Sequence, residues 1–135
     1  MIKVVVIDAN AISRNLLTSV LVNGGFEVVG DTNVSSAGLA NAIKLAPQLV
    51  CMDVGAIDEE GLARLDTIRQ GLPKALVFLV SGKFDATGVQ SARERGVHGF
   101  IVKPFKADTV LATIRKAVIT LARAHRHGRA EDHSG

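Results

Sequence analysis

The sequence predicts an α/β fold, a doubly wound three-layer (α/β/α) sandwich built on a five-stranded parallel sheet. Three observations lead to this prediction. Short apolar runs without alternation are typical of strands that are buried on both faces. These runs alternate along the chain with segments in which apolar residues recur at helical spacing. Strands that alternate with helices pair in parallel through right-handed crossovers, which place helices on both faces of the sheet.

The first half of the chain contains three of the predicted strands. A β-branched run at residues 3–7 ends at Asp8, and residues 11–22 then take helical spacing, with one apolar face made by Ile12, Leu16, Leu17, Val20 and Leu21. Asn23-Gly24-Gly25 ends that helix, residues 26–30 form the second strand, and Ser35 or Ser36 caps a helix that Pro47 ends. Residues 49–53, Leu-Val-Cys-Met-Asp, form the central strand, which ends in the carboxylate of Asp53.

The second half repeats the same alternation twice. A third helix is marked by Leu62, Leu65, Ile68 and Leu72 and closed by Gly71 and Pro73. Residues 75–80 form the fourth strand, a helix follows from about residue 85 to residue 95, and Gly96 ends it. Residues 100–102 form the fifth strand. Apolar residues from Val110 to Leu121 then stripe a final long helix.

We expect one domain, residues 1–122, followed by a basic tail at residues 123–135. The tail loses apolar periodicity and is expected to be disordered, and its His125, His127 and His133 could bind a metal only adventitiously. The composition, 47% hydrophobic and 21% charged, is typical of globular proteins. No membrane-length apolar run or signal-peptide pattern is visible, so the expected location is the cytoplasm.

Single residues narrow the classes of function further. The one cysteine, Cys51, excludes an internal disulfide and a cysteine metal cluster, and we interpret it as a core residue. The net charge of +3 is weak support for nucleic-acid binding, because no stripe of aromatic and basic residues accompanies it. We therefore expect no direct contact with nucleic acid or membrane.

Four polar residues follow the ends of four predicted strands: Asp8, Asp53, Ser81 and Lys103. In open parallel sheets, ligands bind beyond the carboxyl ends of the strands, so these side chains converge on one rim. Two carboxylates, a hydroxyl and an ammonium suit phosphoryl transfer, in which a carboxylate attacks and cations balance the oxygen charge. Taken singly, each residue could instead cap a helix or turn, or be a solvated surface charge.

The sequence resembles the receiver domain of bacterial response regulators, of the CheY-like, stand-alone type, over about residues 1–122. The resemblance is carried by Val-Val-Val-Ile-Asp-Ala-Asn at 4–10, Leu-Val-Cys-Met-Asp at 49–53, Gly-Leu at 61–62, Leu-Val-Ser-Gly at 79–82 and Gly-Phe-Ile-Val-Lys-Pro-Phe at 99–105. The last segment is the most specific. The resemblance implies a flavodoxin-like fold with strand order 2-1-3-4-5.

The resemblance also implies a role for each residue on the rim. Asp53 would accept a phosphoryl group from a sensor histidine kinase or phosphotransfer protein, with Ser81 bonding the phosphoryl oxygens and Lys103 pairing with them. Mg²⁺ would be held by Asp8, Asp53 and Gly55, with Asn10 as a weaker ligand. Phe100 matches the aromatic switch position, which together with Ser81 reshapes the face of the fourth helix, fifth strand and fifth helix. The Lys103–Pro104 bond would be cis.

The sequence departs from the family pattern at three positions. Ala9 stands where a second acidic residue is usual, which removes a direct metal ligand and weakens the expected Mg²⁺ affinity. Ile57 stands where a proline is usual, four residues after Asp53. Ser81 replaces the commoner threonine but keeps the hydroxyl.

Three functions remain in competition. The first is a phosphoacceptor receiver whose output is contact with a downstream protein target. Such a receiver would be a monomer or weak dimer, and it would not be a conventional enzyme although it can autodephosphorylate. The second is a degenerate receiver that acts as a phosphorylation-independent interaction module. The third is a phosphohydrolase or nucleotide-binding protein. The third is disfavoured because Asp8-Ala9-Asn10 lacks the second aspartate of such hydrolases and is not a glycine-rich turn.

Overall fold

The computed structural model describes the backbone of residues 1–134 and the side chains of residues 1–124. Its centre is a five-stranded parallel sheet in the order β2-β1-β3-β4-β5. The strands are β1 (Lys3–Ile7), β2 (Glu27–Thr32), β3 (Leu49–Met52), β4 (Leu76–Ser81) and β5 (Gly99–Val102). This arrangement confirms the predicted fold class and strand order.

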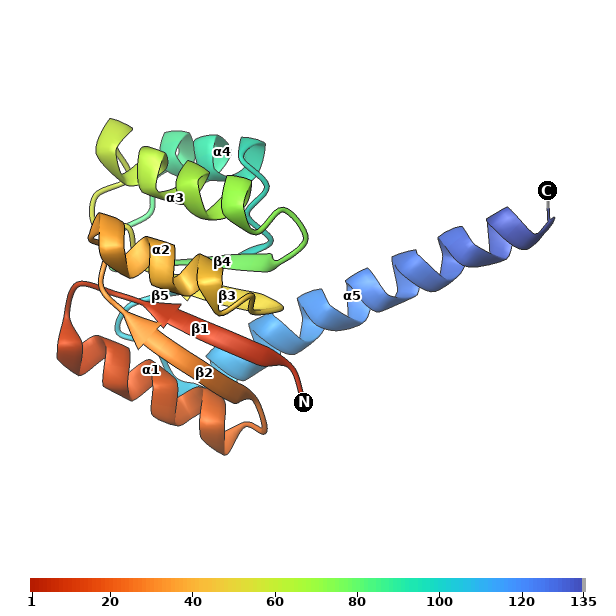
Figure 1. Ribbon diagram of the computed structural model, residues 1–135, viewed down its shortest axis with the longest axis horizontal. Helices are drawn as coiled ribbons and strands as arrows, with labels where there is room; N and C mark the ends of the chain where they lie inside the picture. Colours follow the sequence, from red (N-terminus) through yellow and green to blue (C-terminus); the bar gives the residue numbers. More distant parts are fainter. Residues whose placement is uncertain (135) are drawn as a thin grey trace.

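Five helices cover the two faces of the sheet. They are α1 (Ala11–Asn23), α2 (Ser36–Lys44), α3 (Glu59–Gly71), α4 (Ala86–Glu94) and α5 (Ala107–Ser134). Helices α2, α3 and α4 lie on one face, and α1 lies on the other face together with the first part of α5 (Figure 1). Side-chain oxygens of Asn10, Ser35, Asp58 and Asp85 cap the N-termini of α1 to α4.

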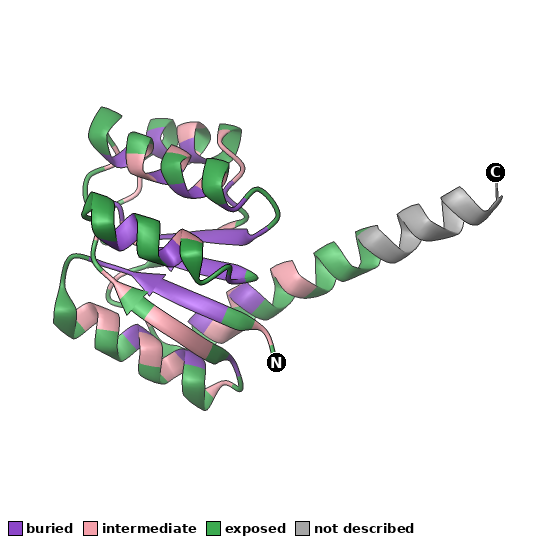
Figure 2. Ribbon diagram, in the orientation of Figure 1, coloured by how far each residue is buried: buried purple, intermediate pink, exposed green. Residues whose placement is uncertain are grey.

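The core consists of two apolar layers, one on each face of the sheet. Alternate residues of the central strands point to opposite faces, so Val5, Val50 and Val77 pack under α2, α3 and α4, whereas Val4, Cys51 and Phe78 pack under α1 and α5. Strands β1, β3 and β4 are buried and the helices turn their exposed residues outward (Figure 2). Continuous burial on both faces explains why these strands have unbroken apolar sequences.

The strand register aligns the carboxyl ends of the three central strands. Ile7 of β1 pairs with Met52 of β3, and Met52 pairs with Leu79 of β4. Asp8 and Asp53 directly follow Ile7 and Met52, so their backbones are neighbours at one edge of the sheet. The Asp53 N–H donates to the Ile7 carbonyl at 2.8 Å, which continues the ladder one residue past β3.

The structure differs from the sequence predictions in two respects. Ile12 and Leu16, expected on the inward face of α1, are 74% and 57% exposed, and Leu17 and Leu21 form the buried stripe instead. The backbone of α5 stays helical to Ser134, past residue 122, where we expected helical order to be lost. The side chains of His125, His127 and His133 lie outside those that the structure describes.

Two further features bear on the predictions. The Lys103–Pro104 peptide bond is cis, as predicted. Within the part of the chain that the structure describes, none of the helices combines the length and the apolar character that a membrane crossing requires.

Candidate functional site

Three charged side chains meet at the carboxyl end of the sheet. The Lys103 Nζ lies 2.7 Å from Asp8 Oδ2 and 2.7 Å from Asp53 Oδ2, so one ammonium bridges two carboxylates. Asp8 follows β1, Asp53 follows β3 and Lys103 follows β5, and Lys103 N–H donates to the Ser81 carbonyl at 2.8 Å. The predicted convergence of these three residues is therefore present in the structure.

The second oxygen of each carboxylate is held by a backbone N–H two residues further on. The Asn10 N–H donates to Asp8 Oδ1 at 2.9 Å, and the Gly55 N–H donates to Asp53 Oδ1 at 2.8 Å. Gly55 has a φ of +84°, a conformation that favours glycine, so residue 55 lets the loop turn back on the aspartate. Both carboxylates are thus fixed at both oxygens.

The electrostatics of the cluster stabilise the lysine in its charged form. Desolvation of Lys103 on its own lowers the pKa of the ammonium, but the hydrogen bonds and charges of Asp53 and Asp8 outweigh it, so that the pKa lies above its ordinary value of 10.5. The side chain of Asp8 is only 7% exposed, whereas that of Asp53 is 15% exposed. Asp53 is the more accessible of the two carboxylates.

Ser81, at the end of β4, pairs with Val102 next to Lys103, and Phe100 lies in β5; the structure gives both side chains partners outside the cluster. The Ser81 hydroxyl donates to the Lys83 carbonyl at 3.0 Å and accepts from the Lys83 N–H at 3.1 Å. Phe100 is half-buried, with its ring edge-to-face against Phe84 at 5.2 Å and the Arg93 guanidinium 5.7 Å from its centroid. Neither side chain is bonded to Asp53 in this conformation.

The cluster offers part of the ligand set that magnesium requires. Mg²⁺ is usually held by one or two carboxylates together with waters and phosphate oxygens. Asp8 and Asp53 supply two carboxylates, and Ala9 supplies no side-chain donor. Among residues with described side chains, no group of three or more His, Cys, Asp or Glu could hold a metal. The residues therefore fit a magnesium ion that keeps several waters, and they do not form an all-protein cage.

Asn10 does not join the cluster through its side chain. Its Oδ1 accepts the N–H groups of Ile12 at 2.9 Å and Ser13 at 3.0 Å, and this caps helix α1. Only the backbone of Asn10 contacts Asp8. The amide oxygen that the sequence analysis assigned to magnesium is thus already occupied by the helix terminus.

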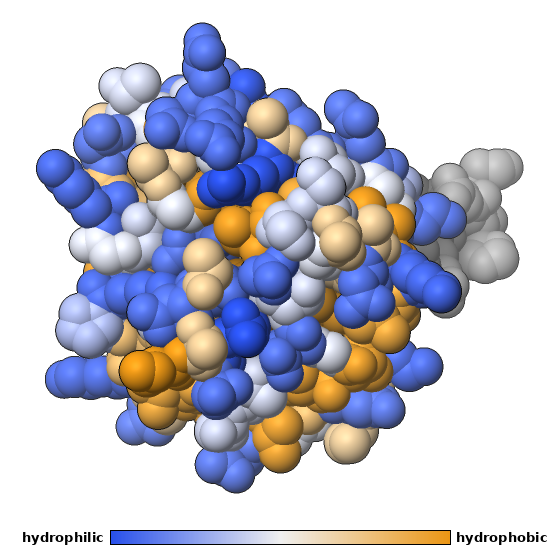
Figure 3. All heavy atoms as spheres, turned by 60° about the vertical axis from the view of Figure 1, so that its left-hand side comes forward, coloured by the Kyte–Doolittle hydropathy of each residue, from blue (hydrophilic) through white to orange (hydrophobic). Residues whose placement is uncertain are grey.

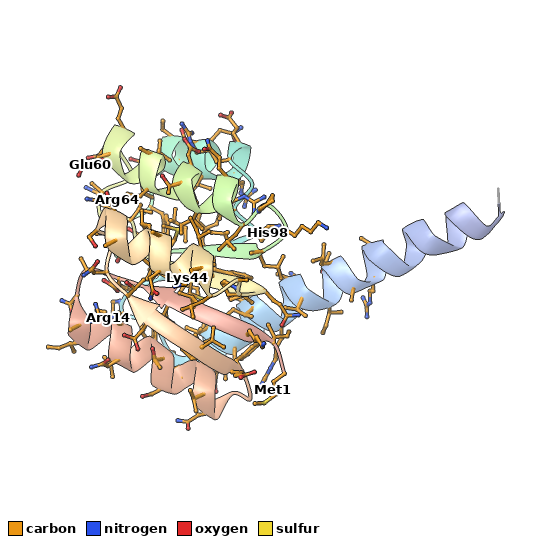
Figure 4. All side chains as sticks on the ribbon, in the orientation of Figure 1. Met1, Arg14, Lys44, Glu60, Arg64 and His98 are labelled. Carbon is orange, nitrogen blue, oxygen red and sulfur yellow. The ribbon has the colours of Figure 1, made fainter. Side chains whose placement is uncertain are left out.

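Sequence reasoning missed two arginines at this edge of the sheet. Arg14 Nη1 donates to the Asp8 carbonyl at 2.9 Å, and Arg64 Nη1 donates to the Val54 carbonyl at 2.9 Å. Figure 4 shows Arg14 and Arg64 at the same end of the molecule, toward which the strands of Figure 1 point. The only signal in the sequence was the spacing of Glu60 and Arg64, which is that of a helical ion pair.

Comparisons of the sequence with known proteins identify the family to which the chain belongs. Residues 4–115 match the model of the response regulator receiver domain family. The chemotaxis protein CheY of Bacillus subtilis is 31% identical over 116 residues, which cover 86% of this chain and 97% of that protein.

Solved structures of response regulators have a similar fold. The crystal structure of a response regulator from Thermotoga maritima has a TM-score of 0.77 at 25% identity and covers 87% of this chain and 98% of that one. NtrX from Brucella abortus also has a TM-score of 0.77, at 31% identity, over 96% of this chain and 29% of its own. The chain therefore belongs to the response regulator receiver domains, of the CheY-like kind, that serve two-component signalling.

Proposed function

We propose that this receiver takes a phosphoryl group onto Asp53 from the phosphohistidine of a sensor histidine kinase or phosphotransfer protein. The observation that carries the proposal is the Lys103 ammonium, held 2.7 Å from the Asp53 carboxylate by a second contact to Asp8. A cation fixed in this way stands beside the place where phosphoryl oxygens would carry negative charge. The cytoplasm is the expected location.

The transfer is a displacement at phosphorus. An Asp53 carboxylate oxygen attacks the phosphorus, the phosphorus–nitrogen bond breaks, and its electron pair returns to the imidazole of the donor. Lys103 would exchange its contact to the Asp53 carboxylate for one to the new phosphoryl oxygens and retain its contact to Asp8. Magnesium held by Asp8, Asp53 and the Gly55 carbonyl would neutralise part of the oxygen charge. The protein is a stoichiometric acceptor in this scheme and not a conventional enzyme.

The phosphorylated state is expected to be read at the face made by α4, β5 and α5. A cavity of about 340 Å³ lies there, beside Val102, which is 58% exposed on β5. It is lined by Phe100, Ile101, Val102, Pro104, Phe105, Lys106, Thr109, Val110 and Thr113. Movement of Phe100 would reshape this cavity, because Phe100 is one of the residues that line it. Amide shifts should then spread from the rim to residues near Val89 and Val110.

The phosphodonor is expected to dock beside α1. This helix begins at the rim, two residues after Ala9, and presents the exposed Ile12 and Leu16 one turn apart. Figure 3, which brings the site end forward, shows separate apolar patches set in a hydrophilic surface. A protein that brings a phosphohistidine to Asp53 can bury such a patch, and burial of exposed apolar side chains favours association.

The proposal is tested by phosphorylation with acetyl phosphate and Mg²⁺, followed by intact-mass measurement. The wild type should gain one hydroxylamine-sensitive phosphoryl group, and Asp53→Asn should gain none. Asp108→Asn, an exposed aspartate in the first turn of α5, is the matched control and should be labelled like the wild type. A hydroxylamine-sensitive label that persists in Asp53→Asn would refute the assignment of the acceptor.

Ala9 favours a second candidate function, a receiver that binds its partners without phosphorylation. Loss of the usual second carboxylate weakens the magnesium site, and a receiver that cannot be phosphorylated can still present the face made by α4, β5 and α5. The same labelling experiment separates the two functions. A wild-type protein that stays unlabelled at saturating Mg²⁺ and acetyl phosphate would contradict the first function and favour the second.

A further inference from the structure

The loop after Asp53 contains one peptide unit that is bonded on both of its sides. Its carbonyl, which belongs to Val54, accepts from Arg64 Nη1 at 2.9 Å. Its N–H, which belongs to Gly55, donates to Asp53 Oδ1 at 2.8 Å. Arg64, the Val54–Gly55 peptide and the Asp53 carboxylate therefore form a continuous hydrogen-bonded chain that reaches the proposed phosphoacceptor.

Arg64 is itself well anchored. It lies in α3, its Nη2 donates to Glu60 Oε1 at 2.9 Å, and its side chain is 28% exposed. Glu60 is 76% exposed, so this ion pair contributes little by itself. The bond to the Val54 carbonyl is the contact that ties Arg64 to the rim, and the two labelled side chains can be followed in Figure 4.

The loop after Asp53 depends on hydrogen bonds such as that of Arg64, because no proline ring restricts its backbone. Ile57 stands where the family usually has a proline, so φ at residue 57 is not restricted by a ring. Gly55, at a φ of +84°, adds a second unrestricted position. The loop is then held by the Arg64 bond, by the Gly55 bond to Asp53, and by the Asp58 carboxylate that caps α3 through the Gly61 N–H at 2.9 Å.

We propose that Arg64 is a positioning residue for phosphorylation of Asp53 and acts through the Val54–Gly55 peptide. This inference rests on the proposed function, because it assigns Arg64 a part in the same transfer. The guanidinium fixes the peptide plane, so that the Gly55 N–H faces Oδ1 while Lys103 holds Oδ2. A charged donor on the carbonyl also polarises the peptide and strengthens the N–H as a donor. Both effects orient the carboxylate before the phosphodonor arrives.

The test compares Arg64→Met with Glu60→Gln. Met keeps an unbranched apolar stem but removes every donor, whereas Glu60→Gln neutralises the other partner of Arg64 and leaves the bond to Val54 in place. Labelling with acetyl phosphate and Mg²⁺ gives the phosphorylation rate. The Gly55 amide proton shift, measured without phosphodonor, reports the bond to Asp53. Thermal denaturation shows whether each variant remains folded.

Arg64→Met should slow phosphorylation roughly tenfold, because small misplacement of a reacting group costs about this much or more. Its Gly55 amide proton should move upfield, as expected for a weaker bond. Glu60→Gln should match the wild type in both measurements, and Arg64→Lys, which keeps one charged donor, should recover part of the rate and of the shift. This rescue separates positioning from a purely structural role, which would lower the melting temperature of Arg64→Met and Arg64→Lys alike.

Two results would overturn the inference. One is equal labelling rates for the wild type and a folded Arg64→Met, and the other is an unmoved Gly55 resonance in that variant. An unlabelled wild type is a distinct result, because it would overturn the proposed function itself together with the role of Arg64 in it.

Discussion

Replacement of Lys103 by methionine tests the electrostatics of the site most directly. The variant Lys103→Met keeps most of the length and apolar stem of the side chain and removes the ammonium that bridges Asp8 and Asp53. It leaves two carboxylates facing each other, one of them 7% exposed and the other 15% exposed. The substitution should therefore lower the free energy of unfolding at neutral pH.

The size of the effect follows from the contacts. Since each bridged oxygen is 2.7 Å from Nζ, the two oxygens are at most about 5 Å apart, and like charges at that separation repel by about 3 kcal/mol at an effective dielectric constant of ~20. Two charge-assisted hydrogen bonds are lost as well. Lys103 is 20% exposed, so water offsets part of the loss, and we expect a destabilisation of about 3 kcal/mol.

The assay is urea denaturation of the wild type, Lys103→Met and Lys103→Met/Asp8→Asn at neutral pH. The double variant removes the repulsion between the two carboxylates and should regain stability relative to Lys103→Met. Lys106→Met, which removes an exposed lysine three residues on, is the control and should match the wild type. A loss below about 1 kcal/mol in Lys103→Met, or a double variant no more stable than Lys103→Met, would refute the reasoning.

Three more outcomes are expected. Ala9→Asp should raise the affinity for Mg²⁺ at least about tenfold in calorimetry, since a carboxylate ~4 Å from a cation contributes several kcal/mol before desolvation. Ala11→Asp, the control, should leave the affinity unchanged. An unchanged affinity in Ala9→Asp would favour the module that acts without phosphorylation. Gly61→Ala should cost about 1–3 kcal/mol in thermal denaturation, because its Cβ would clash with the Ala56 carbonyl oxygen, whereas Gly82→Ala, with 3.9 Å to its nearest contact, should be neutral. Burial, followed by the charge of Arg69, lowers the pKa of His98 below its ordinary value of 6.5. As the pH drops through 6.5, the unfolded chain therefore binds this proton before the folded chain does, and the free energy of unfolding falls. His98→Asn should reduce the difference between the free energies of unfolding at pH 7.5 and pH 5.5, measured by urea denaturation.

The fold could be predicted from the sequence because both of its signals are local. Unbroken apolar runs such as residues 76–80 and helical stripes such as Leu17 with Leu21 are visible without tertiary information. Because the signal is local, the predicted inward face of α1 also included two residues that are exposed in the structure. Ile12 and Leu16 have the right spacing and hydrophobicity, but they lie on a side of α1 that faces solvent, whereas the neighbouring stripe of Leu17 and Leu21 faces the sheet.

The site could be predicted in part. Asp8, Asp53 and Lys103 were found because each follows a recognisable strand, and parallel strands bring such positions together. Arg14 and Arg64 were missed because they act on backbone carbonyls, whose positions no sequence pattern specifies. Asn10 shows a competition between two uses of one side chain. Its amide was assigned to a metal, but an asparagine just before a helix has a competing use as an N-cap, and the N-cap is what the structure shows.

The bridge made by Lys103 also bears on how the chain folds. Asp8 and Lys103 are 95 residues apart in sequence, whereas most neighbouring strands of the sheet belong to consecutive strand-helix-strand units. Contacts of such long range form late, after loop closure has already been achieved by the strands between them. Loss of the bridge should therefore raise the unfolding rate and leave the refolding rate nearly unchanged. On this reasoning, substitutions confined to the rim should change the unfolding rate more than the refolding rate.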